Sequence, residues 1–223
     1  MILPASVRET PWDKNVFGLN TFEILTFDSP ARDFVKTTPG HFTTKVDPLS
    51  DCRPLVQGGF YYCDTLIEPY ATKDMATLYE DQRAGICDVN MEELTPICLG
   101  AFEHGRFHRD RNLDRSAADR RYLQWLAQMH SEGGVFGLTW EGVLAAFFAC
   151  SESRILLHAV AEPYRGKGLA KFLWSAAILE LFKHGYDELS SSISTANLAV
   201  LNLYSSLGFR FRNAIDVYHM LTP

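Results

Sequence analysis

Features typical of membrane, secreted and nucleic-acid-binding proteins are missing from this 223-residue chain. No apolar run reaches the roughly 20 residues that a membrane-spanning helix needs. Residues 1–5 lack the basic and long apolar segments of a signal peptide. The net charge of −6 disfavours nucleic acid as a partner. The sequence therefore predicts a cytoplasmic protein that binds neither membranes nor nucleic acid.

Cysteine is scarce, and its spacing excludes the usual metal and disulfide frameworks. The five cysteines are Cys52, Cys63, Cys87, Cys98 and Cys150. Cysteine-based zinc sites place pairs of ligands two to four residues apart. Separated cysteines in odd number are typical of reduced, buried thiols. No cysteine has the partner expected of a covalent acyl carrier, so we expect neither a metal nor an acyl-enzyme.

The most informative segment is a glycine turn, Arg165-Gly166-Lys167-Gly168-Leu169-Ala170. An apolar run at 155–160 precedes it and is typical of a strand, while 169–182 is typical of a helix. Two glycines at such a junction let backbone N–H groups converge on one point. The beginning of the helix adds about half a positive charge there. The turn therefore predicts an anion site, most often one for a phosphate.

Two common phosphate motifs do not fit this turn. The dinucleotide fingerprint needs a third glycine near the start of a βαβ unit. Asp187 lies at a suitable distance for its acidic residue, but the turn comes late in the chain. The nucleoside-triphosphate loop needs G-x-x-x-x-G-K-[ST], which Lys167 does not complete. A glycine turn that binds nothing remains the alternative.

The pattern R-x-x-G-x-A, with Val160 five residues before it, resembles the acyl-coenzyme A signature of the GNAT superfamily of N-acetyltransferases. Members share the order of elements that follows the turn. Here these are a strand at 188–194, Asn197, a helix at 198–207 carrying Tyr204, Gly208-Phe209, and a strand at 216–221. The resemblance covers 135–221 and implies an α/β fold with a mixed (α+β) sheet. It also implies direct transfer of an acetyl group from acetyl-CoA to a primary amine.

The resemblance also implies a set of site residues. Tyr204 would protonate the leaving sulfur, because a phenol with a pKa near 10 is protonated at neutral pH. His158 titrates in the range of a base, although the alternation of strand faces leaves its direction open. The cofactor would be bound by Ala159, Val160, Arg165, Gly166, Lys167, Gly168, Leu169, Ala170 and Asn197.

Other readings of these residues stay open. Tyr204 and His158 are also compatible with packing in a core, and Asn197 with capping the next helix. Pro163 lies one place nearer to Arg165 than is usual in the family. His108, Asp110 and Glu68 are further candidates for the base, as is an ordered water.

An earlier stretch resembles part of the same unit. Residues 49–60 and 198–209 both begin with Leu, end in Gly-Phe and lie between strand-like runs. We interpret residues 1–70 as a partial GNAT-like half and residues 71–223 as the acetyl-CoA-binding domain, although chance similarity is an alternative. The boundary is expected where Pro69 breaks a strand. The first half has no glycine turn, so we expect it to extend the sheet and to wall the acceptor site rather than to bind coenzyme A.

Two segments resemble the dTDP-fucosamine acetyltransferase group within the superfamily. They are residues 12–18 and a helix–loop–helix region at 101–126. This resemblance implies a nucleotide-linked amino sugar as the acceptor, with Arg106, His108 and Asp110 in the substrate site. A solvated, self-neutralised loop is the alternative. An amino acid or polyamine acceptor and a non-catalytic coenzyme A module also stay open, and a homodimer is an expectation from the family.

Overall fold

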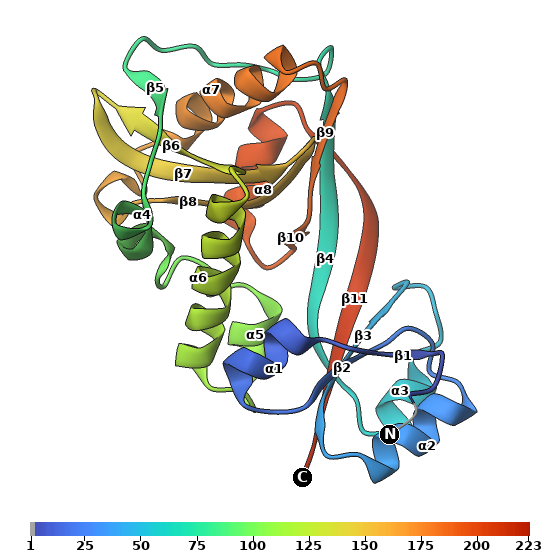
Figure 1. The fold of residues 1–223 in the computed structure, drawn as a ribbon. Coiled ribbons are helices and arrows are strands. Elements are labelled where there is room, and N and C mark those ends of the chain that lie inside the picture. The colour runs from blue at the N-terminus through green and yellow to red at the C-terminus, as the bar shows by residue number, and fades with distance from the viewer. Residues whose placement is uncertain (1–2) are drawn as a thin grey trace. The chain divides into compact units, whose positions relative to one another are not determined.

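The computed structural model describes residues 3–223, which form two compact units. Unit 1 comprises the residues up to Leu66, Glu103–Arg121 and Ala214–Pro223. Unit 2 comprises Ile67–Phe102 and Tyr122–Asn213. The two longest strands, β4 (Tyr61–Thr72) and β11 (Arg210–Thr222), are neighbours and contribute residues to both units (Figure 1). Each unit is described by itself.

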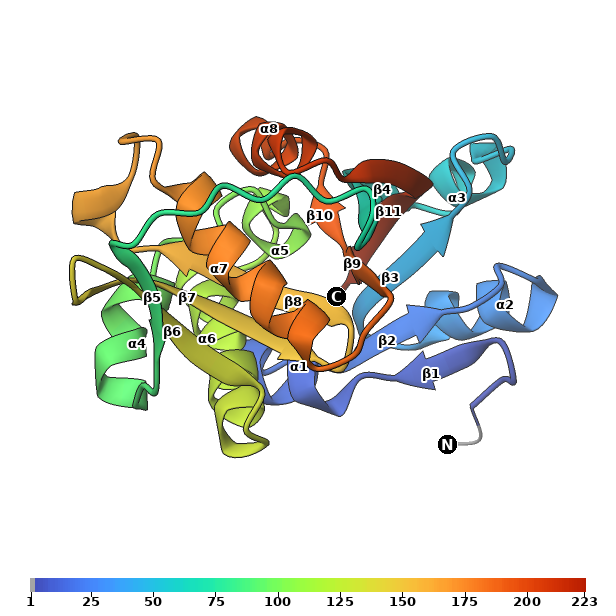
Figure 2. The same cartoon turned by 90° about the horizontal axis from the view of Figure 1, so that it is seen from above.

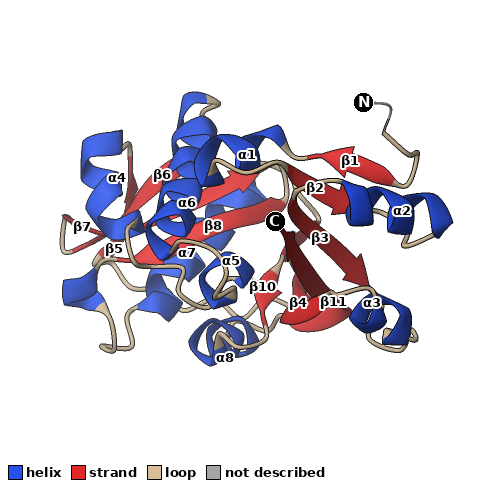
Figure 3. Ribbon diagram, turned by 90° about the horizontal axis from the view of Figure 1, so that it is seen from below, coloured by secondary structure: helices blue, strands red, loops and turns tan. Residues whose placement is uncertain are grey.

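Unit 1 is a small sheet with short helices, in the strand order β1-β2-β3-β11-β4. The β2/β3 pair is parallel, and the β1/β2 and β3/β11 pairs are antiparallel. Phe22, Phe34 and Phe42 pack in its core, where α2 and α3 cover the strands (Figure 3). The other elements are β1 (Val7–Glu9), α1 (Pro11–Phe17), β2 (Thr21–Ile24), α2 (Ser29–Thr37), β3 (Gly40–Val46), α3 (Arg53–Gln57), α5 (Arg106–Arg109) and the first part of α6 (Arg115–Ser131).

Unit 2 has the strand order β4-β9-β8-β7-β6-β5, with β10 paired to β4. The β8/β9 pair is parallel, whereas β4/β9, β5/β6, β6/β7 and β7/β8 are antiparallel. Its elements are β5 (Ala84–Cys87), α4 (Met91–Cys98), β6 (Val135–Trp140), β7 (Val143–Ser151), β8 (Arg154–Val160), α7 (Ala170–Lys183), β9 (Glu188–Ser191), β10 (Ile193–Ser194) and α8 (Leu198–Ser206).

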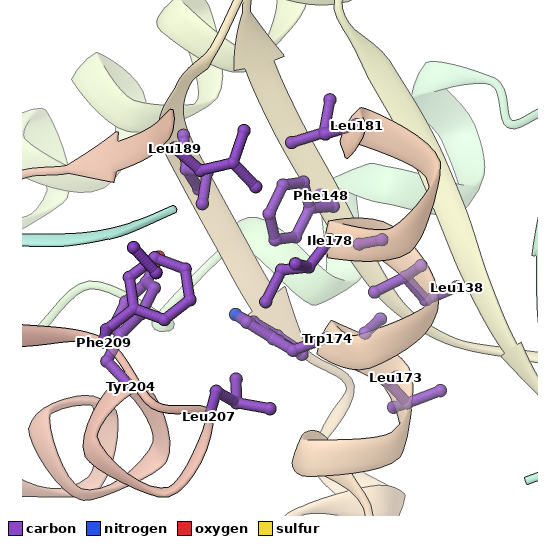
Figure 4. Packing of buried hydrophobic residues seen from close by; sticks show 14 of the residues in the cluster. Leu138, Phe148, Leu173, Trp174, Ile178, Leu181, Leu189, Tyr204, Leu207 and Phe209 are labelled. Carbon is purple, nitrogen blue, oxygen red and sulfur yellow. The ribbon is translucent and has the colours of Figure 1, made fainter. Parts of the chain in front are cut away.

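The sheet of unit 2 is buried on both faces, with α7 on one side and α4 on the other (Figure 2). Successive strand residues point to opposite faces. Phe148 therefore packs with Trp174 and Tyr204, as Figure 4 shows, while Phe147 packs with the cluster that contains α4 and α6 residues. Both phenylalanines are fully buried, so β7 contributes to the core on both faces of the sheet.

The mixed α/β fold is confirmed, and two details of the expected elements are wrong. The strand does not break at Pro69, because β4 continues to Thr72. Pro69 lies directly before the three β4 residues paired with β9, so its missing N–H takes no bond from that pairing. The helical stretch expected within 49–60 is reduced to α3, Arg53–Gln57. Among the described residues, none of the helices is both long and apolar enough to cross a membrane.

Phe148 provides a test of the packing in unit 2. We expect Phe148→Ala to lower the free energy of unfolding by about 3–5 kcal/mol, because it removes a buried ring and leaves a cavity. Val143→Ala on the same strand is the control. Its side chain is exposed, so we expect a change within about 0.5 kcal/mol. Urea titrations of both variants would measure this, and equal losses would contradict the described core.

Candidate functional site

The glycine turn lies at the junction of β8 and α7, as expected from the sequence. A short 3₁₀ turn, Glu162–Tyr164, leaves the strand, and the chain then passes through Gly166 and Gly168, both at φ 71°. This left-handed conformation favours glycine over residues with a Cβ. An added Cβ at either position would meet nothing within 4 Å. The glycines are therefore required by the backbone conformation and not by crowding.

The turn presents a row of unused backbone donors. Within residues 3–223, the N–H groups of Gly166, Lys167, Gly168 and Leu169 make no hydrogen bond. Leu169 occupies the N-cap of α7 and provides no side-chain cap. All four residues are exposed or half-buried. The positive end of α7 and these amides together are suited to bind an anion.

The corresponding helix in unit 1 has its N-terminus filled. Helix α2 follows the parallel strand β2 as α7 follows β8, but its N-cap is Asp28. The Asp28 carboxylate accepts hydrogen bonds from the Ala31 N–H at 2.9 Å and from the Ser6 hydroxyl at 2.8 Å. A carboxylate of the chain itself thus occupies the position that a bound phosphate would take at α7.

Strands β8 and β9 separate after a short pairing. Only Arg154 and Ile155 of β8 pair with β9, and β10 then pairs with β4. On the other side, Ala159 lies opposite Phe147 of β7, and the Ala161 N–H bonds to the Ala145 carbonyl at 2.8 Å. Because hydrogen-bonded pairs alternate in an antiparallel ladder, Ala159 directs its backbone toward β7. The sequence-based choice of Ala159 is thereby corrected: His158 and Val160 direct their backbone groups into the gap.

The gap brings together the two residues expected to be catalytic. The Nε2 atom of His158 on β8 lies 3.1 Å from the hydroxyl of Tyr204 on α8. Their side chains share one face of the sheet with Trp174 of α7, whose ring lies 4.9 Å from that of His158. The direction of the His158 side chain, left open by the sequence, is thus toward α7 and α8.

Burial keeps both members of this pair neutral. Desolvation lowers the pKa of His158 to about 4, partly offset by a contact with its own backbone. Desolvation also raises the pKa of Tyr204, whose side chain is fully buried, and the neighbouring Ser191 hydroxyl offsets part of this effect. At neutral pH the pair is therefore an uncharged imidazole and an uncharged phenol.

The remaining candidates of unit 2 have partners within the chain. The Asn197 side chain caps α8 by accepting from the Val200 N–H at 3.2 Å. The Nε atom of Arg165 donates to the Val160 carbonyl at 2.8 Å, which fixes the entry into the turn. Glu68, a candidate base, is paired with Arg212. Lys167 and Ala170 lie in the turn itself and at the first residue of α7.

The candidate substrate residues lie in unit 1, and two of them are enclosed. His108 is buried, and its Nε2 atom lies 3.0 Å from an Asp119 carboxylate oxygen. Asp110 is 2% exposed and is held by several donors from the chain. Arg106 stacks on Phe107 at 4.7 Å. His108 and Asp110 therefore belong to an internal network, which disagrees with the alternative interpretation of this segment as a solvated loop.

Several polar groups that the fold brings into these clusters could not be identified from sequence patterns. Trp174 is 1% exposed, and its Nε1 has no hydrogen-bond partner among the described residues. Figure 4 draws this nitrogen at the end of the ring nearer to Tyr204. His41 and His219, which contact Asp110, lie 69 and 109 residues from it in the chain. No short motif can reveal residues that lie so far apart in the chain. Both histidines meet because β3 and β11 are paired strands.

Comparisons with known proteins agree with this geometry. Residues 101–209 match the family described as "Acetyltransferase (GNAT) family". No sequence among curated proteins matches the chain. Similar solved structures include a GCN5-related N-acetyltransferase from Kribbella flavida, with a TM-score of 0.64 and 12% identity over 100% of this chain and 89% of that one. At these identities the structural similarity establishes the fold.

Two further structures have the same fold. The GCN5-related N-acetyltransferase from Sphaerobacter thermophilus has a TM-score of 0.60 and 10% identity, covering 96% of this chain and 76% of that one. A tandem GNAT protein from the clavulanic acid biosynthesis pathway has a TM-score of 0.55 and 13% identity, covering 92% and 77%. Residues 101–209, just under half of the chain, are thus similar to the GNAT acetyltransferases, which are acyl-CoA-dependent N-acetyltransferases.

The anion site predicts how a substitution in the turn acts. Gly168→Asp should abolish the rise in melting temperature caused by saturating acetyl-CoA, because it adds negative charge beside the free amides. For the intact protein, a ligand at 100 times its Kd adds about 2.7 kcal/mol of stability.

Gly142→Asp is the matched control. Gly142 lies in the β6–β7 turn at φ 79° and also has open space around it. Its substitution by Asp therefore introduces similar backbone strain away from α7. We expect this variant to keep the full ligand-induced shift. An equal loss in both variants would attribute the effect to strain and contradict the anion site.

The neutral state of His158 predicts a pH dependence of stability. Its pKa in the folded chain, about 4, lies below the usual 6.5, so the unfolded chain takes up a proton first as the pH falls. His158 should therefore cost stability progressively between about pH 6.5 and pH 4. Urea midpoints of the intact protein and His158→Gln should converge over this window, and a constant difference would contradict the assignment.

Proposed function

We propose that this GNAT acetyltransferase binds the diphosphate of acetyl-CoA at the beginning of α7 and its pantetheine arm in the gap between β8 and β9. The observation that carries this proposal is the row of unbonded amides at Gly166–Leu169 on an uncapped helix. The gap adjoins that row, and the backbone N–H groups of His158 and Val160 face it. An extended amide-bearing chain is complementary to such groups, as an added strand would be.

The acetyl group would then move directly to a primary amine. The amine nitrogen attacks the thioester carbonyl carbon, the C–S bond breaks, and the sulfur leaves as a thiolate that needs a proton. Tyr204 would supply it, since burial keeps its hydroxyl protonated. The Val160 N–H, directed into the gap, is the candidate donor to the carbonyl oxygen as negative charge develops there.

The His158–Tyr204 pair would make this proton transfer less costly. A thiol has a pKa of about 8.5, so complete transfer from a phenol of raised pKa is uphill. When the His158 Nε2 carries a proton, it can donate to the phenolic oxygen at 3.1 Å and stabilise the developing phenolate. The phenolate would then regain its proton from the acylated nitrogen, which leaves a neutral amide, a free thiol and a neutral Tyr204.

His158 itself is too weak a base to deprotonate an ammonium group. Its pKa of about 4 lies far below that of an alkylamine. Glu68 is held by Arg212, and the internal partners of His108 and Asp110 occupy those side chains. We therefore infer that the amine reacts in its neutral form after losing its proton to water.

A nucleotide-linked amino sugar is the acceptor that we propose. Its support is the resemblance of residues 12–18 and 101–126 to acetyltransferases of such sugars, together with the basic residues of that region. Since His108 and Asp110 are buried, the diphosphate would depend on the arginines, of which Arg111 is exposed. An amino acid or polyamine is the second candidate, because the acidic chain favours cationic amines in general.

We also propose that the two halves are diverged copies of one GNAT-like unit. Positions in the second copy follow those in the first by 149 residues, as Gly59 and Gly208 illustrate. The Phe60 N–H bonds to the Leu55 carbonyl, and the Phe209 N–H to the Tyr204 carbonyl, each at 3.0 Å. The same helix ending thus recurs before a long strand, β4 or β11. A tandem GNAT protein is among the similar structures. In the first copy Leu55 takes the place of Tyr204, so that copy lacks a catalytic hydroxyl.

Removing the Tyr204 hydroxyl tests the mechanism. We expect Tyr204→Phe to lower kcat about 100-fold, within the range for loss of a general acid, while the Kd for acetyl-CoA stays within about twofold. Tyr186→Phe, in the same unit, should leave both constants unchanged. Release of free thiol and calorimetric titration would provide the two readouts, and an unchanged kcat in Tyr204→Phe would remove this residue from the mechanism.

The acceptor can be identified by measuring thiol release with a panel of amines. We expect the highest kcat/KM with a nucleoside-diphosphate amino sugar, and a lower value with the same sugar lacking its nucleotide. Arg111→Ala should raise KM for the nucleotide sugar and leave that for the free amino sugar unchanged. A polyamine or amino acid as the best substrate would contradict the nucleotide-sugar assignment while leaving acetyl transfer intact.

A further inference from the structure

A second cluster of chemically active side chains lies wholly inside unit 1. His41 comes from β3, His219 from β11, and Asp110 from the residue that ends α5. Their exposed fractions are 2%, 0% and 2%. The mechanism above uses none of them, and their sequence spacing matches no metal motif. The fold alone makes them neighbours.

The two imidazoles converge on a single carboxylate oxygen. The Nδ1 atom of His219 lies 2.8 Å from Oδ2 of Asp110, and Nε2 of His41 lies 3.2 Å from the same atom. The rings are nearly perpendicular, at 81°, with centroids 4.6 Å apart. Each residue offers one candidate ligand atom, and these three atoms all lie within 4.8 Å of one another. Two nitrogen lone pairs and a carboxylate can therefore be directed at one point.

The carboxylate of Asp110 is also held from behind. The Tyr61 hydroxyl donates to its two oxygens at 3.1 and 3.0 Å, and the Asn112 N–H donates to Oδ1 at 2.9 Å. Metal-binding carboxylates are normally fixed by hydrogen bonds of this kind from surrounding groups. The Nε2 of His219, which faces away from Asp110, is buried without a hydrogen-bond partner among residues 3–223. With Nδ1 on an ion, this Nε2 would carry the imidazole proton.

We propose that His41, Asp110 and His219 form a binding site for a divalent transition-metal ion of the zinc class. Two imidazoles and one carboxylate are a donor set that zinc, cobalt and ferrous iron share, whereas magnesium and calcium prefer oxygen ligands. Zinc bonds of about 2.0–2.2 Å place neighbouring ligand atoms roughly 3.3 Å apart, close to the carboxylate–imidazole distances here. The ion would link β3, β11 and the end of α5, and so has a structural role in unit 1.

The test is direct metal binding by the full chain. Protein stripped with a chelator is titrated with Co²⁺, whose visible absorption reports ligation, and with Zn²⁺ in competition. We expect one ion per chain, with Zn²⁺ displacing Co²⁺ and raising the melting temperature. His219→Phe, which keeps a ring of similar size, and Asp110→Asn should each weaken binding at least 100-fold.

His108→Phe is the matched control, because His108 is another buried histidine of unit 1 that contacts a carboxylate, Asp119. This variant should bind one ion as the intact chain does. Circular dichroism and melting of each stripped variant verify that it folds. If Asp110→Asn folds and His219→Phe does not, metal binding by Asp110→Asn alone decides whether the cluster is the site. Absence of stoichiometric binding in the intact chain, or binding that survives in both cluster variants, would overturn the proposal and leave a hydrogen-bonded latch.

Discussion

The exposed peptide N–H groups at the beginning of α7 are the constraint on which the rest of the site depends. A helix leaves its first amides without partners, and they must find an acceptor in the chain, in water or in a ligand. At α2 the chain supplies Asp28, and at α7 it supplies only glycines and Leu169. The N-terminus of α2 is therefore closed by the chain, and that of α7 is open. One capping side chain makes the difference between a helix that can accept an anion and one that cannot.

A second constraint is that the backbone N–H and C=O groups of β8 need hydrogen-bond partners. Its pairing with β9 stops after Ile155, while its pairing with β7 continues to Val160. Beyond Ile155, the backbone groups of β8 that face the gap have no partner in a neighbouring strand. Leaving buried backbone groups without partners is costly unless a ligand or water bonds to them. The gap and the amide row are consecutive along the chain. A cofactor with a diphosphate and an amide-bearing arm satisfies both with one molecule.

Much of unit 2 could be predicted from local signals. The glycine turn, the helix after it and the Gly-Phe ending at Gly208 each depend on residues close in sequence, where backbone conformation and capping are decided. The face on which His158 lies could not be predicted, because it depends on the register with Phe148 of β7. The exchange of Ala159 for His158 as a backbone donor has the same cause. The register between two paired strands decides which face each side chain occupies. The sequence of one strand alone does not reveal that register.

Unit 1 shows the opposite limit of sequence reasoning. The charged run at 106–111 has the composition of a solvated loop, yet Asp110 is buried between histidines of β3 and β11. The pKa of Asp110 is held well below its usual range by hydrogen bonds from those histidines, despite the opposing effect of burial. Desolvation also lowers the pKa of His219 to about 3, so the cluster contains one negative charge and a neutral His219. A buried negative charge is costly in a low-dielectric interior. A bound cation of the proposed kind would offset that cost.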